Sequence, residues 1–595
     1  MLSGLMHLIH GGIFWIRNRI TSRQFLLLSS VFVGISAALA VILLKTFAHQ
    51  VYLFASDLNQ RLHFQYVNFI LPVIGIVLTV FIVKRVLKGN LEKGTWRIIY
   101  AITKRSSILP RAQMYAQIIT SSITVGFGGS AGLESPVTIT GAAFGSNYAR
   151  QYRLSAKERT LLLACGVAAG IAAAFNAPIA GVLFTMEVLL ADVGISAFIP
   201  LMLSAATGAL VSTVILNDKI LLSLKGQLDF DYFNILWYIL LGILTGFIAV
   251  YHSRMFVRIE GYFERLHWGK YRKAIIGALL LSVMILLFPC LFGEGYESVK
   301  VLSTLHPENL LNDTFFSNIP QQEVLLLLFV GVVVFLKAIA TGITLGSGGN
   351  GGNFAPSLFV GSYTGFAFAY GLNLTGWFDK IPVTNFTMVG MAGMLSGLFH
   401  APLTAMFLIA EITGGYNLMI PLMIVSSISF AISKRFVPHS MDTQKLAEDG
   451  HVMRADKDRH VLSTIDQQAV LEEMVVVLNP DDTIDTLFRT VRTTRQALFP
   501  IVNDRGSLLG MIYLNDLPDL LHIHATDPNT PLESFMEPII FYAGPDDPME
   551  KIMDLFDQSG LSYLPLIYQD QVLGYYSKTR LLDAYRKKVV ESIVE

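Results

Sequence analysis

A single carboxylate stands in an otherwise uncharged stretch of this sequence. Glu134 is the only ionisable side chain in the run SITVGFGGSAGLESPVTITGAAFGS, residues 122–146. At membrane depth an ionised carboxylate costs about 2.5 to 3.5 kcal/mol, so a functional role is the first hypothesis. At the start of a helix, free backbone N–H groups and the helix dipole would stabilise the ionised side chain. Protonation would remove the charge and release Glu134 from those groups.

A second candidate site is the glycine-rich run GSGGNGGNFAP, residues 346–356. Glycine-rich loops that open helices present free backbone N–H groups, and these bind an anion without a formal cation. A full opposite charge in low dielectric would hold a small anion too tightly to release it. We therefore predict that Gly352 and Asn353, with Gly132 of the GLESP segment, bind an anion. Glu134 would compete with that anion as a tethered carboxylate.

The composition places these segments in a membrane. The chain has 595 residues, of which 53% are hydrophobic and 15% charged, and its mean hydropathy is +0.54, well outside the balance of soluble globular proteins. Gly, Pro and Asn interrupt the apolar segments of 112–192 and 354–412, which indicates half-helices buried in protein. Longer apolar stretches approach the roughly 20 residues that span a bilayer: 24–48, 66–87, 196–216, 232–256, 273–292, 322–341 and 417–437.

Charge and cysteine content exclude several classes of protein and suggest an orientation. The formal net charge is zero, so no nucleic-acid partner is expected, and the two cysteines argue against disulfides and cysteine-ligated metals. Basic residues before the first apolar stretch and in the loop 84–111 place both in the cytoplasm. We expect an integral, multi-pass protein with both termini cytoplasmic. Short linkers and a compact tail favour a bacterial inner (plasma) membrane.

The apolar part of the chain repeats itself. The segment AAAFNAPIAGVLFTMEV (172–188) returns as SGLFHAPLTAMFLIAEI (396–412), and GLESP (132–136) returns as GNFAP (352–356) at nearly the same separation. Internal repeats with broken helices in corresponding positions predict a transporter whose site lies at the interface between the repeats.

A different composition begins near residue 440, where polar and charged residues replace the apolar stretches. In this tail NPDDTIDTLF (479–488) returns as GPDDPMEKIM (544–553), and LFPIVNDRGSLLGMI (498–512) returns as YLPLIYQDQVLGYY (563–576). Each unit has the pattern of a helix, two short strands around a turn, and a closing helix. The duplication resembles a pair of CBS motifs, which in their family pack into one module able to bind adenine nucleotides.

The nucleotide expectation has an alternative. The family's nucleotide-binding copies follow a glycine with Ser or Thr three residues on and Asp three after that, whereas this chain divides the pair between its copies. Asp516 follows Gly510, and Ser577 follows Gly574. We therefore expect either a regulatory module with an adenine nucleotide near Asp516 and Ser577, or a structural, dimer-stabilising module without nucleotide. The domain boundaries we predict are 1–445 and 446–595.

Together, GLESP, GNFAP, FNAPIAGVLFTMEV and the trailing CBS pair resemble the CLC chloride channels and chloride/proton exchangers over essentially the whole chain. The resemblance implies an all-α membrane domain of two inverted, pseudo-symmetric halves, followed by an α/β CBS-pair domain, in a homodimer with one anion path per subunit. It places the family's external gating glutamate at Glu134 and its anion-binding amides at Phe354 and Ala355. The segment SSILP (106–110) stands where the family has a serine loop, so Ser107 would donate its hydroxyl to the anion.

Two positions depart from the family pattern. Exchangers of the family have two successive glutamates after the FNAP helix, the second serving as the intracellular proton relay, but this chain has Glu187 and then Val188. Glu187, like Glu411 of the second repeat, is interpreted as a structural carboxylate. At the inner gate the family has a tyrosine that completes the central anion site, and an ungapped count puts Asp442 there. Asp442 would either face the cytoplasm or mark a wider, wetter inner gate.

These residues predict chloride transport gated by protonation of Glu134. Because the proton-relay glutamate is absent, we favour channel-like conduction over the alternative, a coupled chloride/proton antiporter. A CBS-regulated divalent-cation transporter is a more distant alternative, since the broken helices offer few carboxylates to coordinate a cation. No enzyme is expected, because the membrane half has no nucleophile-and-base pair and no metal-ligand cluster. Chloride is the expected substrate, protons are a candidate second one, and no cofactor is required.

Overall fold

A computed structural model describes most of the chain, and it divides into two compact units, Met1–His451 and Val452–Glu595. The predicted boundary at 445/446 lies within the C-terminal end of the first unit. The residues described are 17–594, except for 18, 63–66, 191–196, 217–229, 304–306, 312–313, 315–321, 449–461, 463–464, 474–475, 495, 505–506, 514–516, 546 and 569–570.

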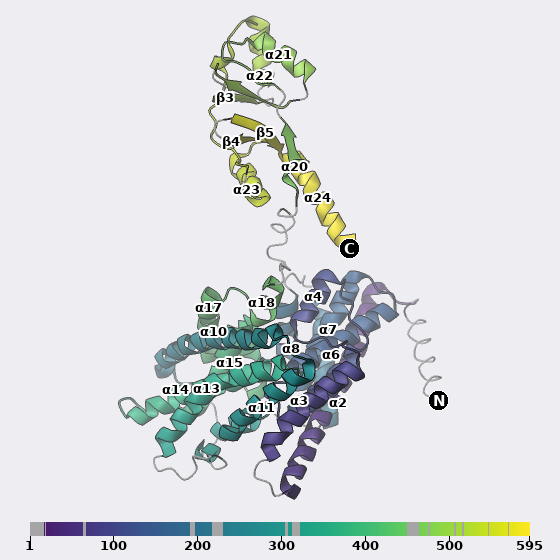
Figure 1. Ribbon diagram of the computed structural model, residues 1–595, viewed down its shortest axis with the longest axis vertical. Helices are drawn as coiled ribbons and strands as arrows, with labels where there is room; N and C mark the ends of the chain where they lie inside the picture. The colour runs from purple at the N-terminus through teal and green to yellow at the C-terminus, as the bar shows by residue number, and fades with distance from the viewer. Residues whose placement is uncertain are drawn as a thin grey trace. The chain divides into compact units, whose positions relative to one another are not determined.

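The first unit is helical throughout its described residues, and its helices pack side by side (Figure 1). The first repeat contains α2 (Ser22–Leu62), α3 (Val67–Arg85), α4 (Trp96–Lys104), α5 (Gln113–Gly126), α6 (Glu134–Gln151), α7 (Ala156–Phe175), α8 (Pro178–Phe184), a π-helical turn (Thr185–Leu189) and α9 (Phe198–Leu216). The second contains α10 (Ile235–Arg265), α11 (Lys270–Leu287), α12 (Tyr296–Leu302), α13 (Gln322–Gly346), α14 (Phe354–Thr375), α15 (Val383–Phe399), α16 (Pro402–Thr413), α17 (Met419–Phe436) and α18 (Met441–Glu448).

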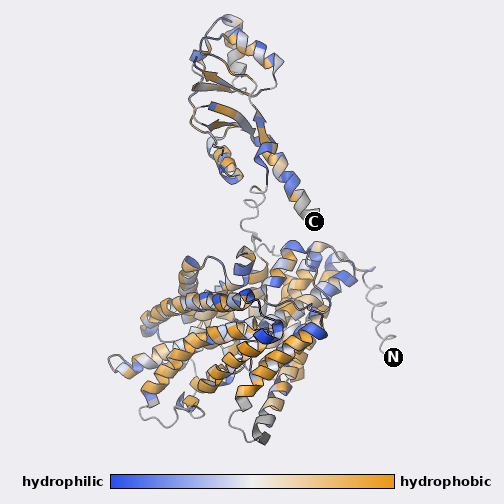
Figure 2. Ribbon diagram, viewed as in Figure 1, coloured by the Kyte–Doolittle hydropathy of each residue, from blue (hydrophilic) through white to orange (hydrophobic). Residues whose placement is uncertain are grey.

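Long apolar helices dominate this unit (Figure 2). Among the described residues, 6 helical segments are long and apolar enough to cross a membrane. The first of them, Ser22–Asp57, includes the apolar stretch expected to be the first span, and another, Glu323–Gly346, has a mean hydropathy of 2.7. The predicted all-helical membrane domain is thereby confirmed.

Both repeats break a helix in the same way. In the first, Asn176 has φ 54° and ends α7, and α8 begins at Pro178; in the second, His400 has φ 56° and ends α15, and α16 begins at Pro402. A left-handed residue stops a helix, and proline fits the first turn of the next one because its missing N–H has no partner to lose there. The predicted half-helices therefore follow from residues that the two repeats share in position.

Equivalent glycines bring neighbouring helices into close contact in each repeat. A Cβ atom on Gly141 of α6 would lie 2.2 Å from the Gly166 carbonyl oxygen of α7. The second repeat has the same contact between α14 and α15, where a Cβ on Gly361 would lie 2.5 Å from the Gly390 carbonyl oxygen. Only glycine fits at such distances, so the backbones of α6 and α7 and of α14 and α15 touch. These contacts fix where α6 and α14 begin.

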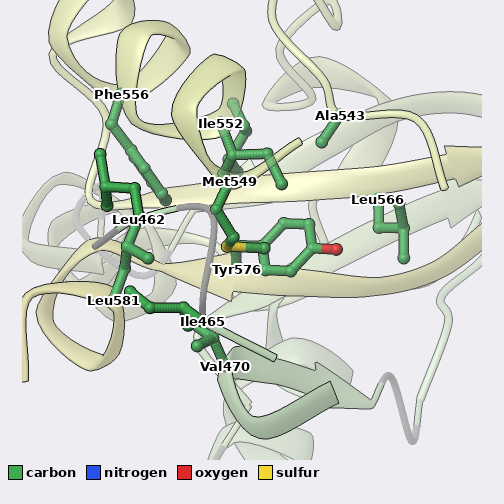
Figure 3. Close-up of a cluster of buried hydrophobic side chains, with 11 residues drawn as sticks. Leu462, Ile465, Val470, Ala543, Met549, Ile552, Phe556, Leu566, Tyr576 and Leu581 are labelled. Atoms are coloured by element: carbon green, nitrogen blue, oxygen red, sulfur yellow. The ribbon is translucent and has the colours of Figure 1, made fainter. Parts of the chain in front are cut away.

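The second unit is an α/β domain with two small antiparallel sheets, of order β1-β5-β4 and β2-β3. Figure 3 shows the core of one half, where Met549 and Ile552 of α23 lie over Tyr576 of β5. The elements are α20 (Gln467–Val470), β1 (Leu471–Glu473), α21 (Ile484–Thr493), β2 (Leu498–Val502), β3 (Leu508–Tyr513), α22 (Leu517–Thr526), α23 (Met549–Ser559), β4 (Tyr563–Tyr568), β5 (Gln571–Ser577) and α24 (Lys578–Val594).

The duplication predicted for this unit is visible in its elements. Each copy pairs two strands as an antiparallel hairpin, β2 with β3 and β4 with β5, after a helix, α21 or α23. Each copy also has its own buried cluster, one around Phe499 and Ile512 and the other around Phe556 and Tyr576. The predicted fold class, a helical membrane domain with an α/β tail, is confirmed.

Candidate ion pathway

The two glycine-rich loops of the repeats meet and bond to each other. The Gly132 N–H donates to the Gly352 carbonyl and the Gly352 N–H donates to the Gly132 carbonyl, each at 2.8 Å. These two N–H groups, predicted to bind an anion, are therefore paired with each other in this structure. The glycines also have a steric role, because a Cβ on Gly132 would lie 2.1 Å from Glu134 Oε2.

Glu134 is the first residue of α6 and is 6% exposed. Its Oε1 accepts a hydrogen bond from the Tyr296 hydroxyl at 3.0 Å, and its Oε2 accepts one from the Ala355 N–H at 3.3 Å. Ala355 lies in the first turn of α14. The carboxylate thus lies at the N-terminal ends of two helices, where dipoles and free amides favour a negative charge.

A second carboxylate, Glu294, lies beside this site. Its Oε1 accepts a hydrogen bond from the N–H of Leu133, the residue before Glu134, at 3.1 Å. The loop that carries Glu294 is held by the buried Lys337, whose Nζ donates to the Gly293 carbonyl at 3.1 Å. Sequence analysis missed Glu294 and Tyr296, because the segment GEGYES lies about 160 residues from Glu134 and matches no part of the repeat.

Glu134 also lines a cavity of about 380 Å³. Three helices begin at its wall: α4 at Trp96, α6 at Glu134 and α14 at Phe354. Three N-terminal ends with their positive dipoles give the cavity the character of an anion site. Other residues that line it are Lys93, Gly94, Thr95, Arg97, Ser135, Gly351, Gly352, Asn353, Phe399, Met441, Asp442 and Lys445.

Ser107, predicted to donate its hydroxyl to the anion, does not line this cavity. Its Oγ is 2.6 Å from Thr160 Oγ1 in the first turns of α7, and its carbonyl accepts from Ser146 Oγ at 2.7 Å. Ser107 follows the end of α4, whereas the cavity meets the start of that helix. The hydroxyl that reaches the cavity belongs to Thr95, immediately before α4, which also donates to Ser135 Oγ at 3.4 Å.

Phe354 and Asn353 both line the cavity. The Phe354 ring packs among aromatic rings from both repeats, with its centroid 5.7 Å from that of Phe175 and 5.4 Å from that of Phe399. Asn353 Oδ1 lies 3.0 Å from His252 Nε2, and Asn353 Nδ2 contacts Met441 Sδ at 2.8 Å. These contacts anchor the start of α14, so the position of the Ala355 amide is set by the core.

Glu187 and Glu411 occupy equivalent positions and make equivalent contacts. Glu187 accepts from the N–H groups of Leu403 at 3.0 Å and Thr404 at 2.7 Å, which begin α16. Glu411 accepts from the N–H groups of Ile179 and Ala180, at 3.1 and 2.9 Å, which begin α8. Each carboxylate thus caps the half-helix of the other repeat.

The neighbouring Val188 is buried and apolar in the π-helical turn, so this position offers no proton-binding group. Asp442 lies in the first turn of α18 and faces the cavity, 8% exposed. Thr95 lines the same cavity.

Lys93 supplies a positive charge at the cavity wall. Its Nζ donates to the carbonyls of Gly348 and Gly349 at 3.0 and 2.7 Å. Burial lowers the pKa of Lys93 to about 8, since the charged form loses water.

The candidate nucleotide residues of the tail are not brought together by any described contact. Asp516 lies outside the described residues. Ser577 is buried at the end of β5, and its Oγ accepts from the Arg580 N–H at 3.5 Å, near the start of α24.

The comparisons with known proteins agree with this architecture. A family model described as "Voltage gated chloride channel" matches residues 75–434, and a CBS domain model matches residues 469–522 and 532–587. The chain belongs to the CLC chloride channel family. It is therefore an integral membrane protein of a family that transports chloride, with a CBS pair behind its membrane domain.

Relatives include proteins named as channels and proteins named as exchangers. A putative chloride channel protein ClcB-like of Ralstonia nicotianae is 28% identical over 363 residues, 60% of this chain and 80% of the relative. The H(+)/Cl(-) exchange transporter ClcA of Yersinia pestis is 32% identical over 328 residues, 53% of this chain and 63% of the relative. The aligned part is thus less than two thirds of the exchanger's length.

Solved structures share the fold at low identity. A slow cyanobacterial Cl−/H+ antiporter matches with a TM-score of 0.62 at 21% identity, covering 72% of this chain and 98% of that one. A eukaryotic CLC transporter matches with a TM-score of 0.60 at 18% identity, covering 93% of this chain and 97% of that one.

Proposed function

We propose that this protein exchanges chloride for protons across the membrane, with Glu134 as the group that serves both ions. The observation that carries the proposal is the contact between Glu134 Oε2 and the Ala355 N–H at the start of α14. Relatives named chloride/proton exchangers, at 32% identity, add support.

The mechanism follows from a competition for one set of backbone amides. While Glu134 is ionised, its carboxylate holds the Ala355 N–H and keeps an anion from it. Protonation removes the charge, so the attraction to the helix N-terminus falls and chloride can displace the side chain. Loss of the proton restores the charge, and the carboxylate then displaces chloride. Each cycle moves a proton and chloride past the same point in opposite directions.

Helix N-termini, rather than an excess of basic side chains, support an anion in the cavity, since carboxylates also line it, including Glu260 and Glu264. The starts of α4, α6 and α14 line it together with Lys93 and Arg97. A hard cation would need several carboxylate or carbonyl oxygens converging on one point. Glu187 and Glu411, which the cation alternative would require, are used as helix caps. The family assignment likewise gives the divalent-cation alternative no support.

Passive chloride conduction is the competing proposal, and the observation that favours it is Val188. With no carboxylate there, the relay position of the family's exchangers is apolar. We place exchange first because relatives named as exchangers match over more than half of this chain.

The deciding experiment is ion flux from liposomes that contain the purified full-length protein. A chloride gradient drives transport, a potassium ionophore sets the membrane potential, and external pH is recorded. Proton movement against the proton gradient, driven by chloride, is the expected result. Chloride efflux without proton movement would replace exchange with passive conduction. Replacing chloride by a large anion tests the substrate, since flux should then stop.

Assembly, location and regulation are parts of the same proposal. We place the protein in a bacterial inner membrane as a homodimer, with both termini in the cytoplasm and one anion path in each subunit. An adenine nucleotide is the proposed ligand of the CBS pair. No enzymatic reaction is assigned.

A further inference from the structure

Proton exchange needs a proton-binding group on the cytoplasmic side of the pathway, and the expected position does not supply one. Val188 is apolar, and the carboxylate beside it, Glu187, is bonded to two backbone N–H groups and to the Thr404 hydroxyl at 2.6 Å. A proton on Glu187 would break contacts that hold the start of α16. If the proposed exchange occurs, another group, either a different carboxylate or water, has to carry the proton at this step.

Asp442 has the placement that this step requires. It lines the same cavity as Glu134 and is more than nine-tenths buried. Its Oδ2 has no hydrogen-bond partner among the described residues. A buried carboxylate oxygen without a partner costs about 1 to 3 kcal/mol or more, so a proton or a water molecule is favoured there.

The orientation of Asp442 follows from the helix before it. The last long apolar helix, α17, ends with Lys434 and Arg435, and α18 begins at Met441 shortly afterwards. Basic residues flank membrane spans on the cytoplasmic side. Asp442 therefore lies at the proposed cytoplasmic end of the cavity.

The basic residues that line the cavity with Asp442 make contacts with other groups. Lys445 of α18 is paired with two α10 carboxylates, Glu260 at 3.2 Å and Glu264 at 2.9 Å. Lys93 donates to two carbonyls, and Arg97 of α4 lies over the Trp96 ring, 4.0 Å from its centroid.

The remaining titratable groups that face this region are Glu134 of α6 and His252 of α10, which is bonded to Asn353. Among the ion pairs of the described residues, none includes Asp442. Because no cation fixes its charge, Asp442 is free to gain and lose a proton.

We propose that Asp442 is the cytoplasmic proton acceptor, which exchanges its proton with Glu134 through water in the shared cavity. This proposal rests on the proposed exchange function. A proton from cytoplasmic water forms an O–H bond at Asp442 Oδ2, and that bond breaks as the proton passes to a cavity water. The water chain delivers one proton to the Glu134 carboxylate, and Asp442 regains its negative charge. The net result is the transfer of one proton from cytoplasmic water to Glu134, and no other covalent bond changes.

The test compares wild-type protein with Asp442→Asn in the liposome assay, recording chloride and proton flux together. Asparagine keeps the shape but cannot carry a proton. Chloride flux should persist, while proton counterflow should fall by about tenfold or more. Asp442→Glu, which restores a carboxyl group, should recover proton flux. Asp379→Asn, a change at an exposed carboxylate outside the cavity, should resemble wild type.

The outcomes separate the two proposals. Asp442→Asn with wild-type proton flux overturns the role of Asp442 and leaves exchange standing. Wild-type protein that moves chloride without protons overturns exchange itself. If Asp442→Asn fails to fold, Thr95→Val gives a second test, because it removes a polar hydroxyl from the cavity that Asp442 lines and keeps the carboxyl group. A less polar cavity favours the protonated form, so Asp442 should then gain its proton at a higher pH. Proton flux should therefore reach half its maximum at an internal pH about one unit higher than in the wild type. An unchanged internal pH profile would overturn the proposal.

Discussion

Gly132 and Gly352 exchange a pair of backbone hydrogen bonds, each 2.8 Å long, and this contact joins the two repeats at the candidate site. Two residues after Gly132 comes Glu134, and three residues after Gly352 comes the Ala355 amide that the carboxylate contacts. The Gly132–Gly352 pair therefore brings the Glu134 carboxylate and the Ala355 amide close together.

Replacing Glu134 with glutamine should remove the pH dependence of chloride flux in the acidic range, between about pH 5 and 7. In the wild type, flux should rise as pH falls, because protonation releases the carboxylate from the Ala355 amide. Glutamine is uncharged at every pH. Chloride should therefore compete with the Gln side chain for the Ala355 N–H equally well between about pH 5 and 7. Proton counterflow should disappear. Liposome flux measured at several pH values checks both effects.

The matched control for that change is Glu297→Gln. Glu297 is 85% exposed on α12 and pairs with Lys300, so its loss should alter neither flux nor its pH profile. A Glu134→Gln variant that still moves protons would remove Glu134 from the proton path.

Tyr296→Phe should move the pH profile of chloride flux upward. The Tyr296 hydroxyl donates to Glu134 Oε1 at 3.0 Å, and a donor favours the ionised form of a carboxylate. Without it, Glu134 should gain its proton at higher pH, and the flux midpoint should rise by about one pH unit. Tyr416→Phe, at a side chain that is 50% exposed, is the control. A midpoint that falls or stays fixed would contradict the role of this hydrogen bond.

The repeats made the helical breaks predictable from sequence, and composition made the position of Glu134 stand out. Pro178 and Pro402 recur in equivalent segments. A proline directly after the end of a helix fits the first turn of a new helix, so each of these prolines predicts that a new helix begins there. Glu134 stood out because a lone acid in an apolar run has few structural reasons to be there. Glu187 and Glu411 were interpreted as structural from the same repeat, and their contacts with backbone amides match that interpretation.

Residues that the fold brings together from distant segments were less predictable. Ser107 was chosen from a short loop pattern, but whether a loop reaches the cavity depends on which end of α4 faces it. Thr95, at the other end, has no distinctive neighbours in sequence. The Gly132 and Gly352 amides were assigned to an anion because nothing in the sequence shows that the loops bond to each other. Both differences concern contacts between segments, which local patterns do not specify.

A larger side chain at Gly141 should destabilise the membrane domain. Its added Cβ would lie 2.2 Å from the Gly166 carbonyl oxygen, so α6 and α7 would have to separate. We expect Gly141→Ala to lower the free energy of unfolding by about 1 to 3 kcal/mol, with a similar loss for Gly361→Ala in the second repeat. Thermal unfolding of the detergent-solubilised protein measures this. Gly331→Ala, where a Cβ meets nothing within 4 Å, should be neutral or slightly stabilising.

Lys93 should produce a separate loss of chloride flux in alkaline solution. Because burial lowers the pKa of Lys93 to about 8, its positive charge is present below that pH and lost above it. The cavity then attracts chloride less, and flux should fall on the order of threefold to tenfold as pH rises through about 8. The effect is best measured in a Glu134→Gln background, where the carboxylate no longer titrates. Adding Lys93→Arg should abolish the decline, since a guanidinium stays charged at these pH values. A decline that persists in the double variant would assign it to another group.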